Sequence, residues 1–313
     1  MPFVHSPTKS DLLLRIPARL CLLLLAASFL SFNLSAAGQT SGRVPTIAVL
    51  DFGDSALGRR ASERLAESLK LDNSLRVDDQ DQVRTAARGA GYSGSINLSL
   101  NEARDLGAAL GSDFFILGDA QTLRRSPSEG PVYFESYASI FLVSAHTGRL
   151  IRWERPNFKA ATAATAEQSL LAQLTTSEAR HDYASLIRRA QEDERSERAA
   201  PIDPQIPIIE EAPEDDKLAE AEGLRLPRPY RRLTPAYPDT AAHAEAEAIV
   251  DVLVDLDESG EVTRVIVARW AGFGLDEATV NTVRQLHFFP ALRNGVAIPI
   301  RVLLRYNFRK PPR

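Results

Sequence analysis

The most regular alternation of hydrophobic and polar residues lies near the C-terminus. Hydrophobic residues occupy every second position of one stretch there: Val250, Val252, Val254 and Leu256. This period of two predicts a strand with one buried face. The polar tetrapeptide 257–260 ends in Gly260, which favours a tight turn, and the hydrophobic stretch 262–267 follows as a returning strand. We therefore predict a β-hairpin.

A helix and a third strand are expected after the hairpin. Gly272 and Gly274 interrupt the strand pattern, and a helix then opens at Leu275 with two acids in its first turn, where the helix dipole favours them. Its expected inner face carries Ala278, Thr282, Val283 and Leu286, and Pro290 marks its expected end. Residues 298–308 alternate throughout, so they predict a final strand with the outward residues Pro299, Arg301, Leu303, Arg305 and Asn307. Because Pro299 cannot donate to a strand ladder, that end of the strand is expected at a sheet edge.

The region before residue 190 shows mixed helix and strand patterns. Thr46–Phe52 is a hydrophobic run suited to a central strand, with Asp54 or Ser55 capping the next helix. Ser99 and Glu102 form a capping-box pattern, and Gly111 suits the end of that helix. Further elements follow the same reasoning: a helix with Leu57, Ala61, Leu65 and Leu69 inward, a helix over 82–88, and strands over 75–77, 114–118, 133–143 and 150–151. These elements predict a small α/β domain with a mixed sheet.

Helix-forming residues over 160–195 are expected to close this domain, with Leu170, Leu171, Leu174, Leu186 and Ile187 against it. Residues 191–226 are acidic and punctuated by proline, which is typical of a disordered linker. Such a linker of roughly 35 residues would reach about 120 Å when fully extended. We therefore predict an α+β protein with domains at 45–190 and 227–313, and a linker that allows the second domain to be presented far from the first.

The first 37 residues have the organisation of a signal peptide. Basic residues precede an apolar run over 20–30, and Ser35-Ala36-Ala37 offers small residues for cleavage after Ala37. The alternative is a retained membrane anchor, because reading on through Leu34 lengthens the apolar segment. Cys21, the single cysteine, lies inside this segment, so the mature chain is expected to contain no disulfide.

Composition and motifs give no indication of nucleic-acid binding, catalysis or a metal site. The formal net charge is −4, and 44% of residues are hydrophobic, as in an ordinary globular protein. The stretch 255–260 imitates the start of a calcium loop, but Ile266 stands where a bidentate Glu is needed. The five histidines show no metal-ligand spacing, and no nucleophile motif is present. We expect no enzyme activity, no cofactor and no metal.

The C-terminal motifs resemble those of the C-terminal domain of TonB, the periplasmic energy transducer. The resemblance rests on motifs in the same order: Pro235-Ala236-Tyr237-Pro238, Gly260-Glu261-Val262, Gly274-Leu275-Asp276, Leu286-His287-Phe288-Phe289-Pro290-Ala291, Gly295 and a strand ending at Phe308. Leu286 stands where the family often has Trp, and Trp270-Ala271 where it often has a small polar residue before the glycine. The resemblance implies a ββαβ domain that binds a segment of an outer-membrane receptor.

The first domain resembles a second group of envelope proteins. Its stretches "IAVLDF", "ALGSDFFILGDA" and "TGRLI" are similar to the small α/β domain of the curli-secretion lipoprotein, of lipoproteins that activate penicillin-binding proteins, and of the N-terminal part of TolB. Such domains serve as interaction or assembly modules in the cell envelope.

Two functional hypotheses follow for a protein of the periplasm or cell envelope. In the first, a TonB-like adaptor binds an outer-membrane receptor or other envelope protein by strand addition, through Arg301, Leu303, Arg305, Asn307, Tyr237 and Pro238. If the N-terminus stays anchored in the inner membrane, motor proteins join the partners. In the second, an envelope scaffold uses the TonB-like fold for binding alone. Self-pairing of the edge into a homodimer is the alternative use of the same strand.

Overall fold

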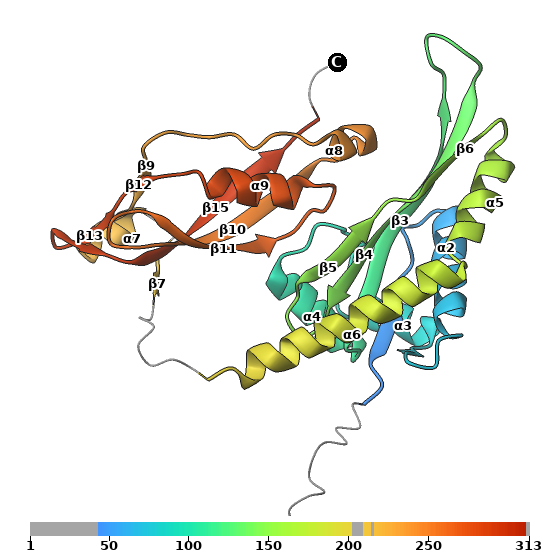
Figure 1. Cartoon of the computed structure of the whole chain (residues 1–313), viewed down its shortest axis with the longest axis horizontal. Helices are drawn as coiled ribbons and strands as arrows, with labels where there is room; N and C mark the ends of the chain where they lie inside the picture. The colour runs from blue at the N-terminus through green and yellow to red at the C-terminus, as the bar shows by residue number, and fades with distance from the viewer. Residues whose placement is uncertain (1–42, 202–208, 214–215, 311–313) are drawn as a thin grey trace, which may run out of the picture. The chain divides into compact units, whose positions relative to one another are not determined.

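A computed structural model describes residues 43–201, 209–213 and 216–310 (Figure 1). The predicted signal segment at 1–37 lies outside these residues. Within the described ranges, no helix is both long and apolar enough to cross a membrane.

The sheet of the N-terminal module (residues 44–201) is built around β1 (Thr46–Val49), whose four residues are all buried. β1 lies parallel between β2 (Arg76–Val77) and β3 (Phe114–Arg125). β4 (Tyr133–Ser144) pairs antiparallel with β3, and both β5 (Leu150–Glu154) and β6 (Asn157–Ala160) pair with β4. The predicted mixed sheet is confirmed, with β3 and β4 longer than expected.

Helices cover both faces of this sheet. Ile47 and Val49 point to one face, which is covered by α2 (Ala56–Leu69), α5 (Ala163–Gln173) and α6 (Ser177–Ala199). Ala48 and Leu50 point to the other, which is covered by α3 (Gln80–Gly89) and α4 (Leu100–Leu110). The helix starts follow the predicted capping: Ser55 caps α2, and Ser99 forms the capping box of α4. Gly111 ends α4 at φ 70°, a conformation that glycine adopts without strain.

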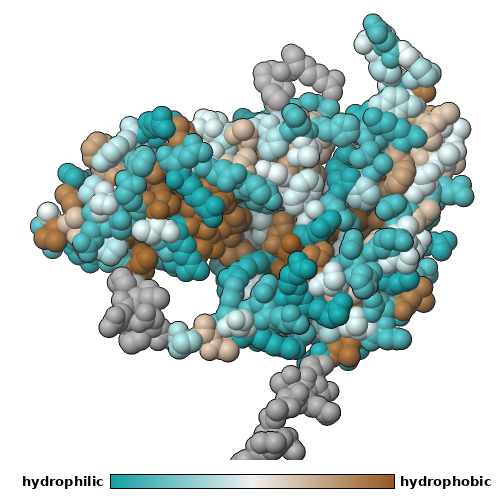
Figure 2. Space-filling view, in the orientation of Figure 1, coloured by the Kyte–Doolittle hydropathy of each residue, from teal (hydrophilic) through white to brown (hydrophobic). Residues whose placement is uncertain are grey.

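The C-terminal module (residues 209–310) has the predicted ββαβ order. β10 (Ala248–Leu256) and β11 (Val262–Arg269) form the hairpin, α9 (Leu275–Val283) follows, and β15 (Ile300–Phe308) pairs antiparallel with β10 along its whole length. The inward residues of β10 are fully buried, as their alternation predicts. Figure 2 shows hydrophobic residues gathered on the face of this module that is turned to the viewer.

The helix ends earlier than Pro290 suggested. α9 stops at Val283, and the chain then forms β12 (Phe288–Phe289), β13 (Ala291–Arg293) and β14 (Val296–Ile298). Phe288 pairs with Pro229 of β9 (Arg228–Pro229), and its backbone N–H donates to Gly260 O at 3.0 Å. These contacts hold Phe288 in an extended conformation, so the helix does not continue to Pro290. Another helix of this module, α8 (Asp239–Ala244), precedes the hairpin.

The described parts of the predicted linker are structured. α6 continues to Ala199, and its buried Glu194 accepts a hydrogen bond from Ser144. β7 (Glu210–Glu211), α7 (Asp216–Ala221), β8 (Leu224–Arg225) and β9 all belong to the C-terminal module. Charge neutralisation explains part of this order, because Glu210 pairs with Arg293 at 2.5 Å and Arg149 with Glu197 at 2.7 Å. Residues 202–208 and 214–215 lie outside the described residues.

The two modules share one hydrophobic cluster, which a tethered pair of separate domains would not do. Phe141 and Val143 of β4 belong to the same buried cluster as Trp270, Phe273 and the inner residues of β10. In this structure the two modules are therefore in contact.

Candidate functional site

The predicted edge strand is β15, and most of one side of it is open. β10 lies along one side, and β7 pairs in parallel with Ile300 and Arg301 on the other. Among the described residues, none pairs with Val302–Phe308 on that second side. β15 thus has an open edge, but not at the end that Pro299 predicted: Ile300 and Arg301, which follow this proline, are paired on both sides because β7 adds to them.

The direction of the free backbone groups follows from one hydrogen bond. Ala212 N–H donates to Arg301 O at 2.8 Å, so the polar backbone groups of Arg301 face the β7 side. Because these groups alternate between the two sides of a strand, those of Leu303, Arg305 and Asn307 face the open side. Backbone donors and acceptors of this kind are what an added strand would bind.

The side chains of the same residues lie together on the outer face of the sheet. Leu303 is 40% exposed, and Arg305 and Asn307 are exposed. Inner residues alternate with them, from buried Ile300 to buried Phe308. The outward set Arg301, Leu303, Arg305 and Asn307 is therefore gathered in one row.

The two arginines are more committed to this fold than the sequence suggested. Arg301 binds Asp255 through two hydrogen bonds of 2.5 and 2.9 Å, and Arg305 binds Asp251 at 2.7 and 3.0 Å. Both aspartates are buried, and the β10–β15 register places each directly opposite its arginine. The hydrogen bond to Asp255 raises the pKa of Arg301. These arginines neutralise buried carboxylates in addition to facing the outer surface.

Tyr237 and Pro238 lie apart from this row. The Tyr237 hydroxyl donates to Ala246 O at 2.8 Å, and its ring lies 6.4 Å from that of Phe308. Pro238 precedes α8 as its N-cap and contacts the loop at Gly274. Their observed contacts hold α8 and the start of the module in place.

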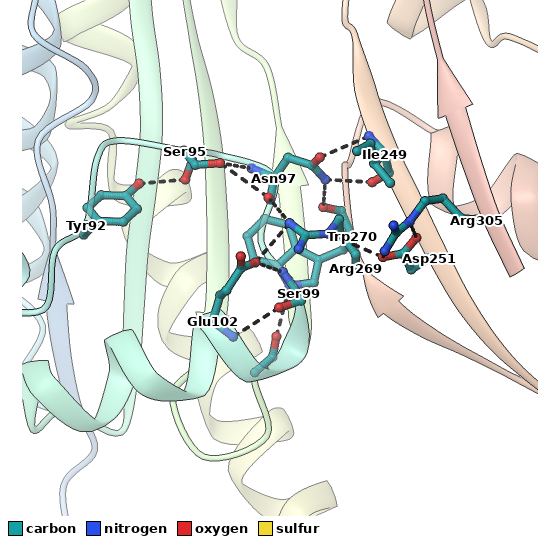
Figure 3. A network of polar contacts seen from close by, with 11 residues as sticks. Tyr92, Ser95, Asn97, Ser99, Glu102, Ile249, Asp251, Arg269, Trp270 and Arg305 are labelled. Carbon is teal, nitrogen blue, oxygen red and sulfur yellow. Dashed lines mark hydrogen bonds and ion pairs between the residues drawn. The ribbon is translucent and has the colours of Figure 1, made fainter. Parts of the chain in front are cut away.

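A second contact surface, which the sequence analysis did not identify, joins the C-terminal module to the N-terminal one. Figure 3 shows its polar part, centred on Asn97 in the loop before α4. The Asn97 amide donates to Ile249 O at 2.8 Å and to Trp270 O at 2.6 Å, and it accepts from Ile249 N–H at 3.1 Å. One side chain thus satisfies backbone groups of β10 and of the loop after β11.

Arg269 extends this network. Its guanidinium donates to Asn97 O at 2.9 Å and pairs with Glu102 at 3.0 Å (Figure 3). The backbone N–H of Trp270 donates to Leu98 O at 3.1 Å, and the neighbouring residues Ser99 and Arg269 form an isolated antiparallel β-bridge. The loop before α4 therefore adds to the end of β11.

The apolar part of this surface is an aromatic cluster. Trp270 is 1% exposed, its ring stacks on Phe141 at 5.8 Å, and its indole N–H donates to Gly148 O at 3.0 Å. The centre of the Phe273 ring lies 5.8 Å from that of Phe141 and 5.5 Å from that of Trp153. A Cβ at Gly272 would come within 2.6 Å of the Phe141 ring, so only glycine allows this approach.

Asp276 holds the loop that carries these residues. Its carboxylate accepts from Ala271 N–H at 2.9 Å and Gly272 N–H at 2.8 Å. Burial raises the pKa of the Asp276 carboxyl to about 6, against the opposing effect of these two hydrogen bonds. The signal for this surface was Trp270-Ala271, which the sequence analysis noted only as a departure from a family pattern.

In the part of the chain that the structure describes, no group of three or more His, Cys, Asp or Glu is placed to hold a metal ion.

Comparisons with known proteins identify the C-terminal module. Residues 234–309 match the family model described as "Gram-negative bacterial TonB protein C-terminal". No curated protein matches the chain.

Solved structures similar to parts of the chain include a TonB C-terminal domain from Pseudomonas aeruginosa, at 20% identity and a TM-score of 0.24, covering 28% of this chain and 89% of that one. The LpoB C-terminal domain from Salmonella enterica is 14% identical with a TM-score of 0.27, covering 43% and 92%. The hypothetical protein CT253 from Chlamydia trachomatis is 13% identical with a TM-score of 0.31, covering 42% and 94%.

Proposed function

Because residues 234–309 form a domain of the TonB C-terminal family, we propose that this chain is a TonB-like adaptor of the cell envelope that binds partner proteins by β-strand addition. It acts in the periplasm as a binding protein rather than an enzyme. Its partner is an outer-membrane receptor or another envelope protein that offers an extended segment.

The observation that carries this proposal is the open side of β15. Val302–Phe308 offers backbone groups on a strand whose other side is fully paired with β10. That pairing, together with the ion pairs of Arg301 with Asp255 and of Arg305 with Asp251, already holds the strand in place. The strand therefore loses little conformational freedom when a peptide binds.

The test removes one open-side donor without touching the β10 ladder. Leu303→Pro deletes a backbone N–H that faces the open side, while Leu303→Thr keeps it and serves as the matched control. Binding of peptides from the N-terminal segments of candidate receptors is measured by calorimetry, and folding by circular dichroism. We expect Leu303→Pro to lose binding and Leu303→Thr to retain it. A folded Leu303→Pro protein that binds as well as wild type would rule out the edge mechanism.

A second candidate function, an envelope scaffold, is favoured by the contact between the modules. Force transfer from an inner-membrane motor requires a retained membrane anchor, whereas a scaffold functions after signal-peptide cleavage. Asn97 and Trp270 join the modules in a way that suits a fixed assembly. Intact-mass measurement of protein from the envelope fraction separates the two: loss of residues 1–37 supports the scaffold, and a mass that includes them supports an anchored transducer.

A further inference from the structure

A groove of about 380 Å³ runs beside the open side of β15. It is lined on the strand side by Val302, Leu303, Leu304 and Arg305, with Phe288 beside them. The other side is formed by Ala212, Pro213, Leu226, Pro227 and Pro229. This volume is near the lower end of the range for ligand pockets, about 300–1,000 Å³, and suits a few side chains.

The second side of the groove comes from the predicted linker and the residues directly after it, all outside the residues that match the TonB family. β7 pairs with the start of β15, and Ala212 N–H donates to Arg301 O at 2.8 Å. β8 pairs with β13, and β9 pairs with β12. Pro213, Pro227 and Pro229 further restrict the backbone here. The linker is therefore a fixed wall of the groove in this chain.

The same wall limits where an added strand can lie. Because β7 already occupies the edge beside Ile300 and Arg301, a partner strand has Val302–Phe308 left to pair with. Side chains of neighbouring strands share a face, so every second residue of the partner would lie beside Val302 and Leu304, over Leu226 and Phe288. All four of these residues are apolar.

We propose that Ala212, Pro213, Leu226, Pro227 and Pro229, which precede the family match, are part of the partner-binding site and select an extended segment that carries an apolar side chain at every second residue. This inference rests on the proposed strand addition at β15. It adds a side-chain specificity that the open backbone alone does not provide, and it assigns that specificity to residues particular to this chain.

The test compares two fluorescein-labelled ten-residue peptides of the same composition. In one, leucine alternates with glutamine; in the other, the leucines are contiguous. We expect the full chain to bind the alternating peptide more tightly. Leu226→Asp should weaken that binding by at least about tenfold, because burial of one large apolar side chain is lost. Leu218→Asp, on an exposed leucine of α7 outside the groove, is the matched control.

A second variant protects the test against misfolding and non-specific adhesion. Leu226→Trp fills the groove while increasing apolar surface, so it should also weaken binding of the alternating peptide; stronger binding would indicate simple hydrophobic adhesion and overturn the proposal. If Leu303→Pro abolishes binding but both Leu226 variants bind like wild type, the groove proposal fails and strand addition stands.

Two further results would overturn the proposal. If neither peptide nor any receptor peptide binds the wild type, strand addition fails together with it. If sedimentation shows that two copies pair through β15 and exclude the peptides, the edge serves a homodimer.

Discussion

The two edges of the C-terminal sheet present different groups. The β15 side offers backbone groups along Val302–Phe308, and the described chain occupies only its start. The β11 side is engaged at its end by the N-terminal module: Asn97 donates to Trp270 O, and the buried Trp270 ring stacks on Phe141 of β4. Backbone pairing tolerates many partner sequences, whereas side-chain fitting of this kind admits one. The β15 edge therefore suits exchangeable partners, and the β11 edge suits a permanent contact.

The largest expected effect comes from removing Trp270. Trp270→Ala deletes the stacking on Phe141 and the hydrogen bond to Gly148 O, and we expect a loss of about 3–5 kcal/mol in unfolding free energy. The modules should then unfold in two transitions, as seen by urea denaturation. Leu71→Ala, an exposed leucine of the N-terminal module, is the control.

This variant also tests the independence of the two sides. Peptide affinity at β15 should match the wild type, because Trp270 does not line the groove beside this strand. Loss of peptide binding in a folded Trp270→Ala protein would show that the two sides are coupled.

The next effect concerns pH. Asp276 has a folded pKa of about 6 and an ordinary value of 3.8, so the folded state binds more protons between these values. The contribution of this group to stability is therefore fully present below about pH 4 and is lost as the pH rises through about 6. The shift corresponds to a contribution on the order of 3 kcal/mol.

Asp276→Asn should remove this dependence. We expect urea denaturation at pH 4, 5, 6 and 7 to show that the difference in unfolding free energy between wild type and variant changes across this range. Asp257→Asn is the control: hydrogen bonding from Ser259 lowers the pKa of Asp257, so its titration lies below the range. A constant difference for Asp276→Asn would contradict the raised pKa.

Local periodicity explains which parts of the fold the sequence predicted. The inner residues of β10 and β15 and the capping box of α4 depend on spacing within one element, and all three are present. The arginine pairs were missed because Asp251 and Arg305 meet only through the register between distant strands.

The contact between the modules was missed for a related reason. Asn97 and Ile249 are 152 residues apart, and no local pattern marks an asparagine side chain that replaces a strand partner. Trp270 stood out only as an unusual residue before a glycine. The linker wall of the groove was hidden by acidic, proline-rich composition, although proline and paired charges also suit a short, rigid segment.

Asn97→Ala should have an intermediate effect. It leaves the carbonyls of Ile249 and Trp270 without this donor in a half-buried site, which costs about 1–3 kcal/mol. Asn101→Ala, on the exposed surface of α4, is the control. Urea denaturation of both variants measures the difference in their free energies of unfolding. Equal stability of Asn97→Ala and Asn101→Ala would show that water replaces the Asn97 amide.

The smallest expected effect is at a second polar contact between the modules, where His243 of α8 meets Glu135 of β4 at 3.0 Å. Burial alone would raise the pKa of Glu135, but hydrogen bonds from Arg125 and His243 outweigh it and lower that pKa. His243 is half exposed, and Arg125 remains 2.9 Å from the carboxylate when the imidazole is removed. We therefore expect His243→Ala to lower the free energy of unfolding by no more than about 1 kcal/mol.

A double-mutant cycle with Trp270→Ala decides whether the two contacts form one interface. If they do, His243→Ala should cause no further loss of stability in the Trp270→Ala background. Additive losses in the free energy of unfolding would show that the His243 pair acts independently of the aromatic cluster.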